Sequence, residues 1–232
     1  MKSLISILLV LLMSKPGYSQ NYEELRQRMV REQIEKRGIY DRATLKSMRK
    51  VARHQFVPPK YRPHAYDDYP LLIGYNQTIS QPYMVAYMTQ LLQPKEGHRI
   101  LEVGTGSGYQ AAVLAEIVDK VYTIEIVKAL SEKAKSVLNK LGYHNVEVII
   151  GDGYQGLASK APFDGIIVTA AAEQIPPPLL NQLKEGGRMV IPIGSPSTVQ
   201  TLMLVTKRNG KITTRELSPV RFVPFTRDKD QE

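Results

Sequence analysis

Alternating glycines occupy residues 104–108, where the sequence reads Gly-Thr-Gly-Ser-Gly. An apolar run at 99–101 precedes them and is typical of a strand, and residues 110–115 follow with the composition of a helix. A strand, a glycine-rich turn and a helix N-terminus together allow the backbone to approach a nucleotide-like ligand. The segment therefore predicts a ligand site at the carboxyl end of a strand.

Two residues beside this loop narrow the choice of ligand. A dinucleotide-binding fingerprint would need a third glycine at position 109, where this chain has Tyr109. Glu102 stands two residues before the first glycine, and its carboxylate would disfavour a pyrophosphate but suit a cation. S-adenosylmethionine carries a sulfonium and an amino group and no phosphate. The sequence therefore favours S-adenosylmethionine as cofactor and S-adenosylhomocysteine as its product.

Two further apolar runs also end in an acidic residue. Residues 120–124 lead into Glu125, at the place where a nucleoside site sets a carboxylate on ribose hydroxyls. Residues 146–150 lead into Gly-Asp-Gly at 151–153, where Asp152 could hold an adenine amino group while the glycines allow a close approach. Taken alone, the two acids would be read as helix caps or turn residues. Together with the glycine loop they favour one ligand crevice at the carboxyl edge of a parallel sheet.

Composition limits the class of protein. The 232 residues, 43% of them hydrophobic, suit one α/β domain with a small extension. The chain has no cysteine, which excludes disulfides and thiolate catalysis, and its four histidines lack ligand spacing, so we expect no metal. The net charge of +9 comes from basic residues scattered over the polar faces of predicted helices. We therefore expect a solvated surface and no nucleic-acid partner.

The N-terminus has the pattern of a secretory signal peptide at residues 1–19. Lys2 precedes an apolar stretch at 4–13, and small residues stand at 17 and 19. This stretch is too short to span a bilayer, so we expect no stable membrane association. We expect cleavage after Ser19 and export to the periplasm or the exterior. The alternative is a leader that stays on the protein.

The remaining pattern alternates helices and strands. Residues 21–37 and 41–51 have apolar side chains at helical spacing, and a stretch rich in proline and tyrosine at 58–82 is typical of a long loop. Two later apolar runs flank Asn209-Gly210, a pair that predicts an antiparallel hairpin. We therefore expect an α/β fold: a doubly wound, mostly parallel Rossmann-like sheet with a C-terminal antiparallel hairpin and an N-terminal helical extension.

The expected domain plan has one folded unit after the leader. Residues 20–232 form a single domain, divided into a helical and loop extension at 20–92, a cofactor-binding core at 93–194, and a C-terminal hairpin and substrate wall at 195–232.

Five segments resemble the protein-L-isoaspartate O-methyltransferases of the class I S-adenosylmethionine-dependent superfamily: 77–86, 101–114, 151–153, 162–171 and 220–224. The whole resemblance runs in order from about residue 24 to residue 226. The combination of the first and last is peculiar to that family among methyltransferases. The resemblance implies methyl transfer from S-adenosylmethionine to the α-carboxyl of isoaspartyl residues in damaged proteins. The ester then collapses to a succinimide, whose hydrolysis returns part of the population to aspartate. We expect a monomer; the family is usually cytoplasmic, which is the alternative to export.

The resemblance places Ser80 at the reacting centre, where its hydroxyl would bond the substrate carboxylate. The alternative role of Ser80 is to cap the helix that follows Pro82. Residues 220–224 would form one wall for an extended substrate peptide.

The resemblance also implies a set of residues around the cofactor. Residues of the loop before Pro82 would cover the cofactor, and the glycines would approach its methionine portion. The acids at the strand ends would hold its amino end, its ribose and its adenine. Residues near the C-terminus would close over the cofactor. In chain order these are Thr78, Ile79, Gln81, Glu102, Gly104, Gly106, Glu125, Asp152, Gly153, Thr226 and Gln231.

Other functions remain open at this point. A small-molecule O-methyltransferase would share the cofactor half but would not need residues 77–82. A non-catalytic S-adenosylmethionine-binding protein would keep Glu125 and Asp152 while losing the chemistry of the loop. A 5-methylcytosine enzyme needs a cysteine, and an amino-group enzyme usually carries Asn/Asp-Pro-Pro-Tyr where this chain has Thr-Ala-Ala at 169–171.

Overall fold

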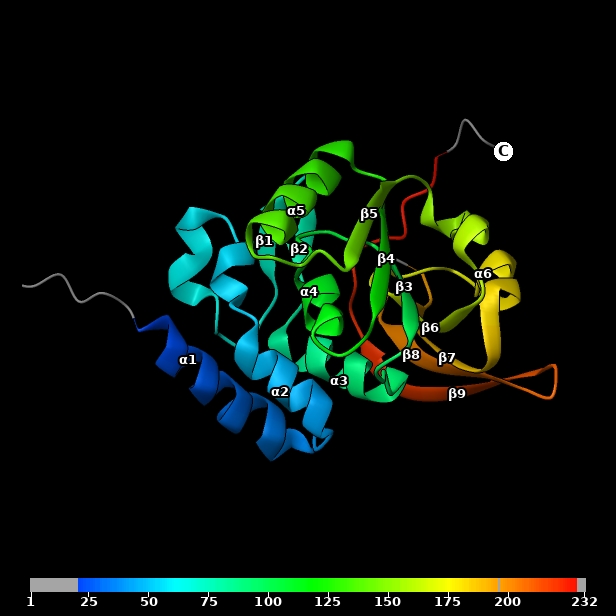
Figure 1. Cartoon of the computed structure of the whole chain (residues 1–232), viewed down its shortest axis with the longest axis horizontal. Coiled ribbons are helices and arrows are strands. Elements are labelled where there is room, and N and C mark those ends of the chain that lie inside the picture. The colour runs from blue at the N-terminus through cyan, green and yellow to red at the C-terminus, as the bar shows by residue number, and fades with distance from the viewer. Residues whose placement is uncertain (1–20, 196, 229–232) are drawn as a thin grey trace, which may run out of the picture.

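The computed structural model describes residues 21–195 and 197–228, so the predicted leader at 1–19 and Gln231 lie outside the described residues. Its centre is a seven-stranded sheet with the order β5-β4-β3-β6-β7-β8-β9 (Figure 1). The strands β3 to β7 pair in parallel, and β8 and β9 add to one edge antiparallel. The strand bounds are β3 Arg99–Val103, β4 Lys120–Glu125, β5 Val146–Ile150, β6 Phe163–Val168, β7 Leu183–Ile193, β8 Gln200–Arg208 and β9 Lys211–Val220. The predicted mostly parallel sheet with a C-terminal antiparallel hairpin is confirmed.

Successive side chains of the strands enter two separate apolar cores, because a strand turns alternate side chains to opposite faces. On β3, Ile100 packs in the core that includes residues of α3 and α4, whereas Leu101 packs in the core that includes Leu179 of α6. Helices therefore cover both faces, as expected for a doubly wound sheet. The helix bounds are α1 Tyr22–Met29, α2 Arg42–Lys50, α3 Pro82–Leu92, α4 Tyr109–Ala115, α5 Lys128–Lys140 and α6 Pro177–Gln182.

The N-terminal extension forms because its caps are encoded locally. The Asn21 side chain accepts a hydrogen bond from the Glu24 N–H at 3.2 Å, and the helix continues past α1 until Gly38, whose φ of 88° ends it. Asp41 caps α2 by accepting from the Thr44 N–H at 2.8 Å. The two predicted N-terminal helices are thus confirmed; α2 packs against α3 and α4, and the continuation of the first helix at Val30–Ile34 packs against α3.

The predicted loop at 58–82 contains a short antiparallel hairpin that the sequence analysis missed. Strands β1 (Leu71–Gly74) and β2 (Gln77–Ile79) pair through a turn at Tyr75 and Asn76, which have φ values of 53° and 55°. Neither turn residue is glycine, so the usual hairpin signal is absent. The hairpin carries Gln77 and Thr78 to the carboxyl edge of the large sheet, beside the glycine loop.

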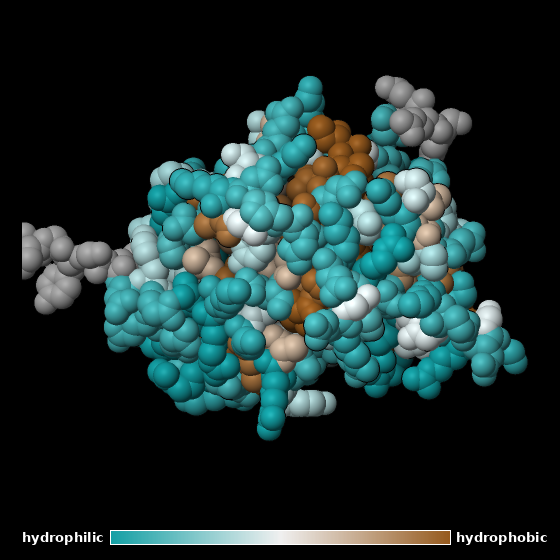
Figure 2. Space-filling view, in the orientation of Figure 1, coloured by the Kyte–Doolittle hydropathy of each residue, from teal (hydrophilic) through white to brown (hydrophobic). Residues whose placement is uncertain are grey.

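After β9 the chain crosses this same edge. The Ala171 N–H donates to the Val223 carbonyl at 2.8 Å, and the Phe225 N–H donates back to the Ala171 carbonyl at 2.9 Å. These two bonds tie the C-terminal segment to the residues that follow β6. The surface is largely hydrophilic, with an apolar patch near the edge strand β5, where Ile150 is exposed (Figure 2). Across the described residues, no helix combines the length and apolar character needed to cross a bilayer.

Candidate functional site

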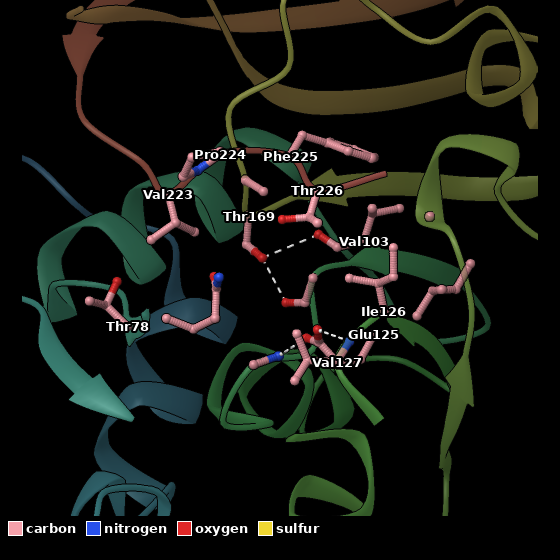
Figure 3. Close-up of a pocket in the computed structure, with 16 residues that line it drawn as sticks. Thr78, Val103, Glu125, Ile126, Val127, Thr169, Val223, Pro224, Phe225 and Thr226 are labelled. Carbon is pink, nitrogen blue, oxygen red and sulfur yellow. Dashed lines mark hydrogen bonds between the residues drawn. The ribbon is translucent and has the colours of Figure 1, made fainter. Parts of the chain in front are cut away.

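A pocket opens where the predicted crevice should lie, at the carboxyl ends of the parallel strands (Figure 3). Its walls come from the ends of β3, β4 and β6, from the turn after β5, from the β1–β2 hairpin and from residues 223–226. The site thus combines the three predicted strand ends with two segments distant in sequence. Carboxyl ends of parallel strands meet at one edge, which explains why the acids and the glycine loop converge.

The glycine loop can adopt its path only with glycine at its first position. Gly104 has a φ of 98°, and a Cβ there would lie 2.4 Å from Thr169 Oγ1. The Thr169 hydroxyl donates to the Gly104 carbonyl at 2.7 Å, so β6 holds the loop through this side chain. Gly106, with a φ of 53°, donates its N–H to Glu125 Oε2 at 2.8 Å. Both glycines line the pocket, as expected.

Glu125 links the loop to the end of β4. Its second oxygen accepts the Val127 N–H at 2.9 Å, so both carboxylate oxygens are bound to backbone while the side chain borders the pocket. A carboxylate has about four acceptor positions. Glu125 therefore keeps acceptor capacity for ligand hydroxyl groups.

The turn after β5 lies against β3. Gly153 lines the pocket, and a Cβ on it would lie 2.3 Å from Val103 Cγ1, so only glycine fits. The neighbouring Asp152 accepts the Tyr154 N–H at 2.9 Å and the Arg227 Nε at 2.8 Å. The side chain of Asp152 is only 3% exposed, and the Arg227 guanidinium carbon lies 3.6 Å from the centre of the Tyr154 ring. Asp152 thus stands beside the pocket with its carboxylate already paired.

Glu102 lies beneath the loop rather than in the pocket, which corrects the expectation that it lies at the cofactor's amino end. Its side chain is fully buried and accepts the Thr123 hydroxyl at 2.5 Å; that hydroxyl lies 2.7 Å from the hydroxyl of Thr105 in the loop. Burial raises the pKa of Glu102 to about 8. The sequence could not distinguish these positions, because burial of a strand-end acid depends on what packs over it.

A second hollow, called here the groove, adjoins the pocket. It is bounded by Arg37, by the start of α3 and by residues 218–223. Thr78 and Thr169 border both the groove and the pocket. Ser80 lines the groove but not the pocket, and the N-cap of α3 is Gln81, which makes no side-chain capping bond. The alternative role of Ser80 as a helix cap is therefore wrong.

The residues predicted to cover the cofactor lie in three different places in the structure. Thr78 and Thr226 line the pocket. Ile79 is instead 3% exposed and packs in the apolar core, where β2 pairs with Leu71. Gln81 lines the groove, and its Nε2 donates to the Asp68 carbonyl at 2.9 Å. Alternation along β2 explains why Ile79 does not line the pocket, because neighbouring side chains of a strand point to opposite faces and that of Ile79 points into the core.

Two residues with clear contacts were missed as site residues. Thr169 follows a buried strand, and a hydroxyl at the carboxyl end of a parallel strand could have identified it. Arg227 had no comparable signal, because nothing in its neighbourhood indicates that it meets Asp152. Within 21–195 and 197–228, no group of three or more His, Asp or Glu side chains could hold a metal ion.

Comparison with known proteins agrees with this geometry. The chain is 56% identical over 227 residues to a protein-L-isoaspartate O-methyltransferase of Opitutus terrae, covering 98% of this chain and 97% of that one. It is 52% identical over 204 residues to the protein of the same name from Gloeobacter violaceus, covering 88% of this chain and 100% of that one.

Two solved structures share the fold of this chain. One protein-L-isoaspartate O-methyltransferase superposes with a TM-score of 0.78 at 30% identity, covering 88% of this chain and 65% of that longer chain. Another, from Plasmodium falciparum and in complex with S-adenosyl-L-homocysteine, superposes with a TM-score of 0.75 at 28% identity, covering 90% of this chain and 99% of that one. The family model for protein-L-isoaspartate(D-aspartate) O-methyltransferase matches residues 24–230. The chain therefore belongs to the protein-L-isoaspartate(D-aspartate) O-methyltransferase family.

Proposed function

We propose that this protein transfers the methyl group of S-adenosylmethionine to the free α-carboxyl of L-isoaspartyl residues in damaged proteins and peptides. The observation that carries the proposal is the contact between the pocket and the groove, which share Thr78 and Thr169. A methyltransferase must bring a donor and an acceptor together at one point. The shared wall supplies that point, and the family relation supplies the substrate class.

The pocket fits the cofactor in shape and in donor chemistry. Neither Gly104 nor Gly153 has space for a Cβ, so the backbone itself forms the floor of the pocket at these two residues. Glu125 offers carboxylate oxygens for ribose hydroxyls, and the turn at Gly153 would border the adenine. Bound S-adenosylmethionine supplies an electrophilic methyl group on a sulfonium.

The groove suits an acceptor that needs no general base. The residues that line it include no histidine, aspartate or glutamate. A peptide carboxyl has a pKa of about 4 and is already ionised at neutral pH, so it needs no base to become a nucleophile. Arg221 lines the groove and provides a positive charge nearby. Ser80, which also lines the groove, would donate its hydroxyl to one carboxylate oxygen and orient the other toward the pocket.

Orientation is the main contribution that these side chains can make. Holding the acceptor oxygen in line with the transferred group can supply roughly 7–11 kcal/mol of the barrier. After transfer, the neighbouring main-chain nitrogen attacks the new ester, methanol leaves, and the resulting succinimide is opened by water. These later steps need no catalytic residue.

The test compares two peptides that differ only in the linkage of one aspartate. We expect methylation of the isoaspartyl peptide and none of the aspartyl peptide, with S-adenosylhomocysteine release as the readout. Equal rates on both peptides would indicate a general carboxyl methyltransferase. Tight cofactor binding without turnover on either would favour the non-catalytic alternative.

The leader and the oligomeric state belong to the same proposal. The pattern at 1–19 supports export, with the cytoplasm, usual for the family, as the alternative. Mass spectrometry of the mature N-terminus decides between them, because an intact Met1 would contradict cleavage after Ser19. We expect a monomer with no nucleic-acid partner, and light scattering at several protein concentrations measures its state.

A further inference from the structure

The turn between β8 and β9 is chemically unusual. It consists of Asn209 and Gly210, the sole Asn-Gly pair in the 232-residue sequence. Both residues are exposed, and their φ values are 51° and 71°. Positive φ at both central positions is the conformation that favours Asn-Gly in a hairpin.

An Asn-Gly pair is also the sequence at which asparagine damages itself most readily, because glycine has no side chain to hinder the reaction. The Gly210 nitrogen attacks the side-chain amide carbon of Asn209, a C–N bond forms, and ammonia leaves. The product is a five-membered succinimide. Water then opens either carbonyl, which gives aspartate or isoaspartate at position 209.

One carboxylate restrains this turn from β7. Glu185 accepts the Gly210 N–H at 3.1 Å and also accepts the Asn209 N–H. Glu185 is itself exposed, so water competes for both bonds. Exposed hairpin tips open locally at little cost in free energy, and each opening frees the Gly210 nitrogen.

The sequence also has two Asp-Gly pairs, at 152–153 and 164–165, and both aspartates are held far more firmly. Asp164 accepts the Arg99 N–H at 2.9 Å and the Lys184 ammonium at 2.6 Å, and its glycine lies within β6 in the middle of the sheet. Asp152 is 3% exposed and paired with Arg227. Of these three pairs, the hairpin tip is therefore the one most open to the damage.

We propose that Asn209 is a site of spontaneous isoaspartate formation and that the damaged tip is methylated by a second copy of this protein. The inference rests on the proposed function. The tip cannot reach its own groove: Gln200, at the other end of β8, pairs with Val220 in the groove wall, and a strand of this length spans about 30 Å. In Figure 1 the turn projects away from the body of the molecule. Methylation therefore occurs between molecules.

The experiment ages the purified protein at neutral pH and physiological temperature, then adds fresh enzyme and methyl-labelled S-adenosylmethionine. Peptide mapping should find label in the segment that contains residue 209, and the rate of labelling should rise with the concentration of fresh enzyme. Asn209→Gly is the matched control, because glycine tolerates the turn's positive φ and carries no side-chain amide. This variant should fold, keep its activity and lose the label from that segment.

An isoaspartyl peptide assayed in parallel separates the two proposals. If the fresh enzyme methylates this peptide but not an aged tip shown to contain isoaspartate, the tip is not a substrate and the inference is wrong. Absence of isoaspartate at 209 after ageing would also overturn it. Failure on the peptide itself would instead contradict the proposed function.

Discussion

Replacing Gly153 by alanine tests how closely the turn after β5 packs on β3. A Cβ built on Gly153 would lie 2.3 Å from Val103 Cγ1, whereas ordinary contacts begin near 3.4 Å. Either the turn or Val103 must therefore move by about 1 Å. Both border the pocket, so the displacement falls on the cofactor site.

The size of the effect follows from the surroundings of Val103. This side chain is 4% exposed and packs in the apolar core beneath the sheet edge, so it cannot swing into solvent. Gly153 does not have the positive φ that would add backbone strain, so the cost is steric. Overpacking of this kind costs about 1–3 kcal/mol. If the whole of this free energy is lost from cofactor binding, the affinity for the cofactor falls about 5- to 150-fold.

The assay is calorimetric binding of S-adenosylhomocysteine together with thermal unfolding, for the wild type, Gly153→Ala, Val103→Ala and the double variant. Val103→Ala removes the methyl group that the new Cβ would meet. We expect the double variant to bind more tightly than Gly153→Ala alone, with a coupling free energy of about 1–3 kcal/mol. Additive effects, or wild-type binding by Gly153→Ala, would refute the reasoning.

Further predictions concern four other side chains. Ser80→Ala should lower kcat about ten- to a hundredfold with cofactor affinity unchanged, because the hydroxyl lines only the groove; a collapse of cofactor binding would show a structural role. Thr169→Val should weaken cofactor binding about fivefold by removing the bond to the glycine loop, and Thr169→Ser should restore it in the same calorimetric assay. Arg227→Gln leaves the buried carboxylate of Asp152 without its ionic partner and should weaken cofactor binding about tenfold; wild-type affinity would mean that the pair plays no part in binding. The pKa of Glu102 is raised from 4.5 to about 8, so the unfolded chain loses this proton well before the folded protein does. Stability should therefore decline as pH rises between these values, and Glu102→Gln should flatten that decline in urea unfolding measured across the range.

The features that depend on local backbone chemistry could be predicted from the sequence. The helix caps at Asn21 and Asp41 form because their side chains reach N–H groups three residues away. The ligand crevice could be predicted from the glycine loop and the acids at the strand ends, because the carboxyl ends of parallel strands meet at one edge of a sheet. The C-terminal antiparallel hairpin could be predicted from Asn209-Gly210, because this pair favours the positive φ values of a two-residue turn.

Which of several neighbouring residues line the site depends on how the elements pack together, and the sequence does not show this. Residues 78–81 are consecutive, yet Thr78 lines the pocket, Ile79 enters the core, and Ser80 and Gln81 line the groove. These different positions depend on the β1–β2 hairpin, which the sequence does not predict, and on the residue at which α3 begins.

The long-range contacts follow the same rule. Arg227 meets Asp152 from 75 residues away, and Val223 bonds to Ala171 across the sheet edge. Backbone conformation and the spacing of apolar residues carry no information about such contacts, because these contacts are set by the packing of whole helices and strands. The burial of Glu102, and with it the direction of its pKa, arises in the same way.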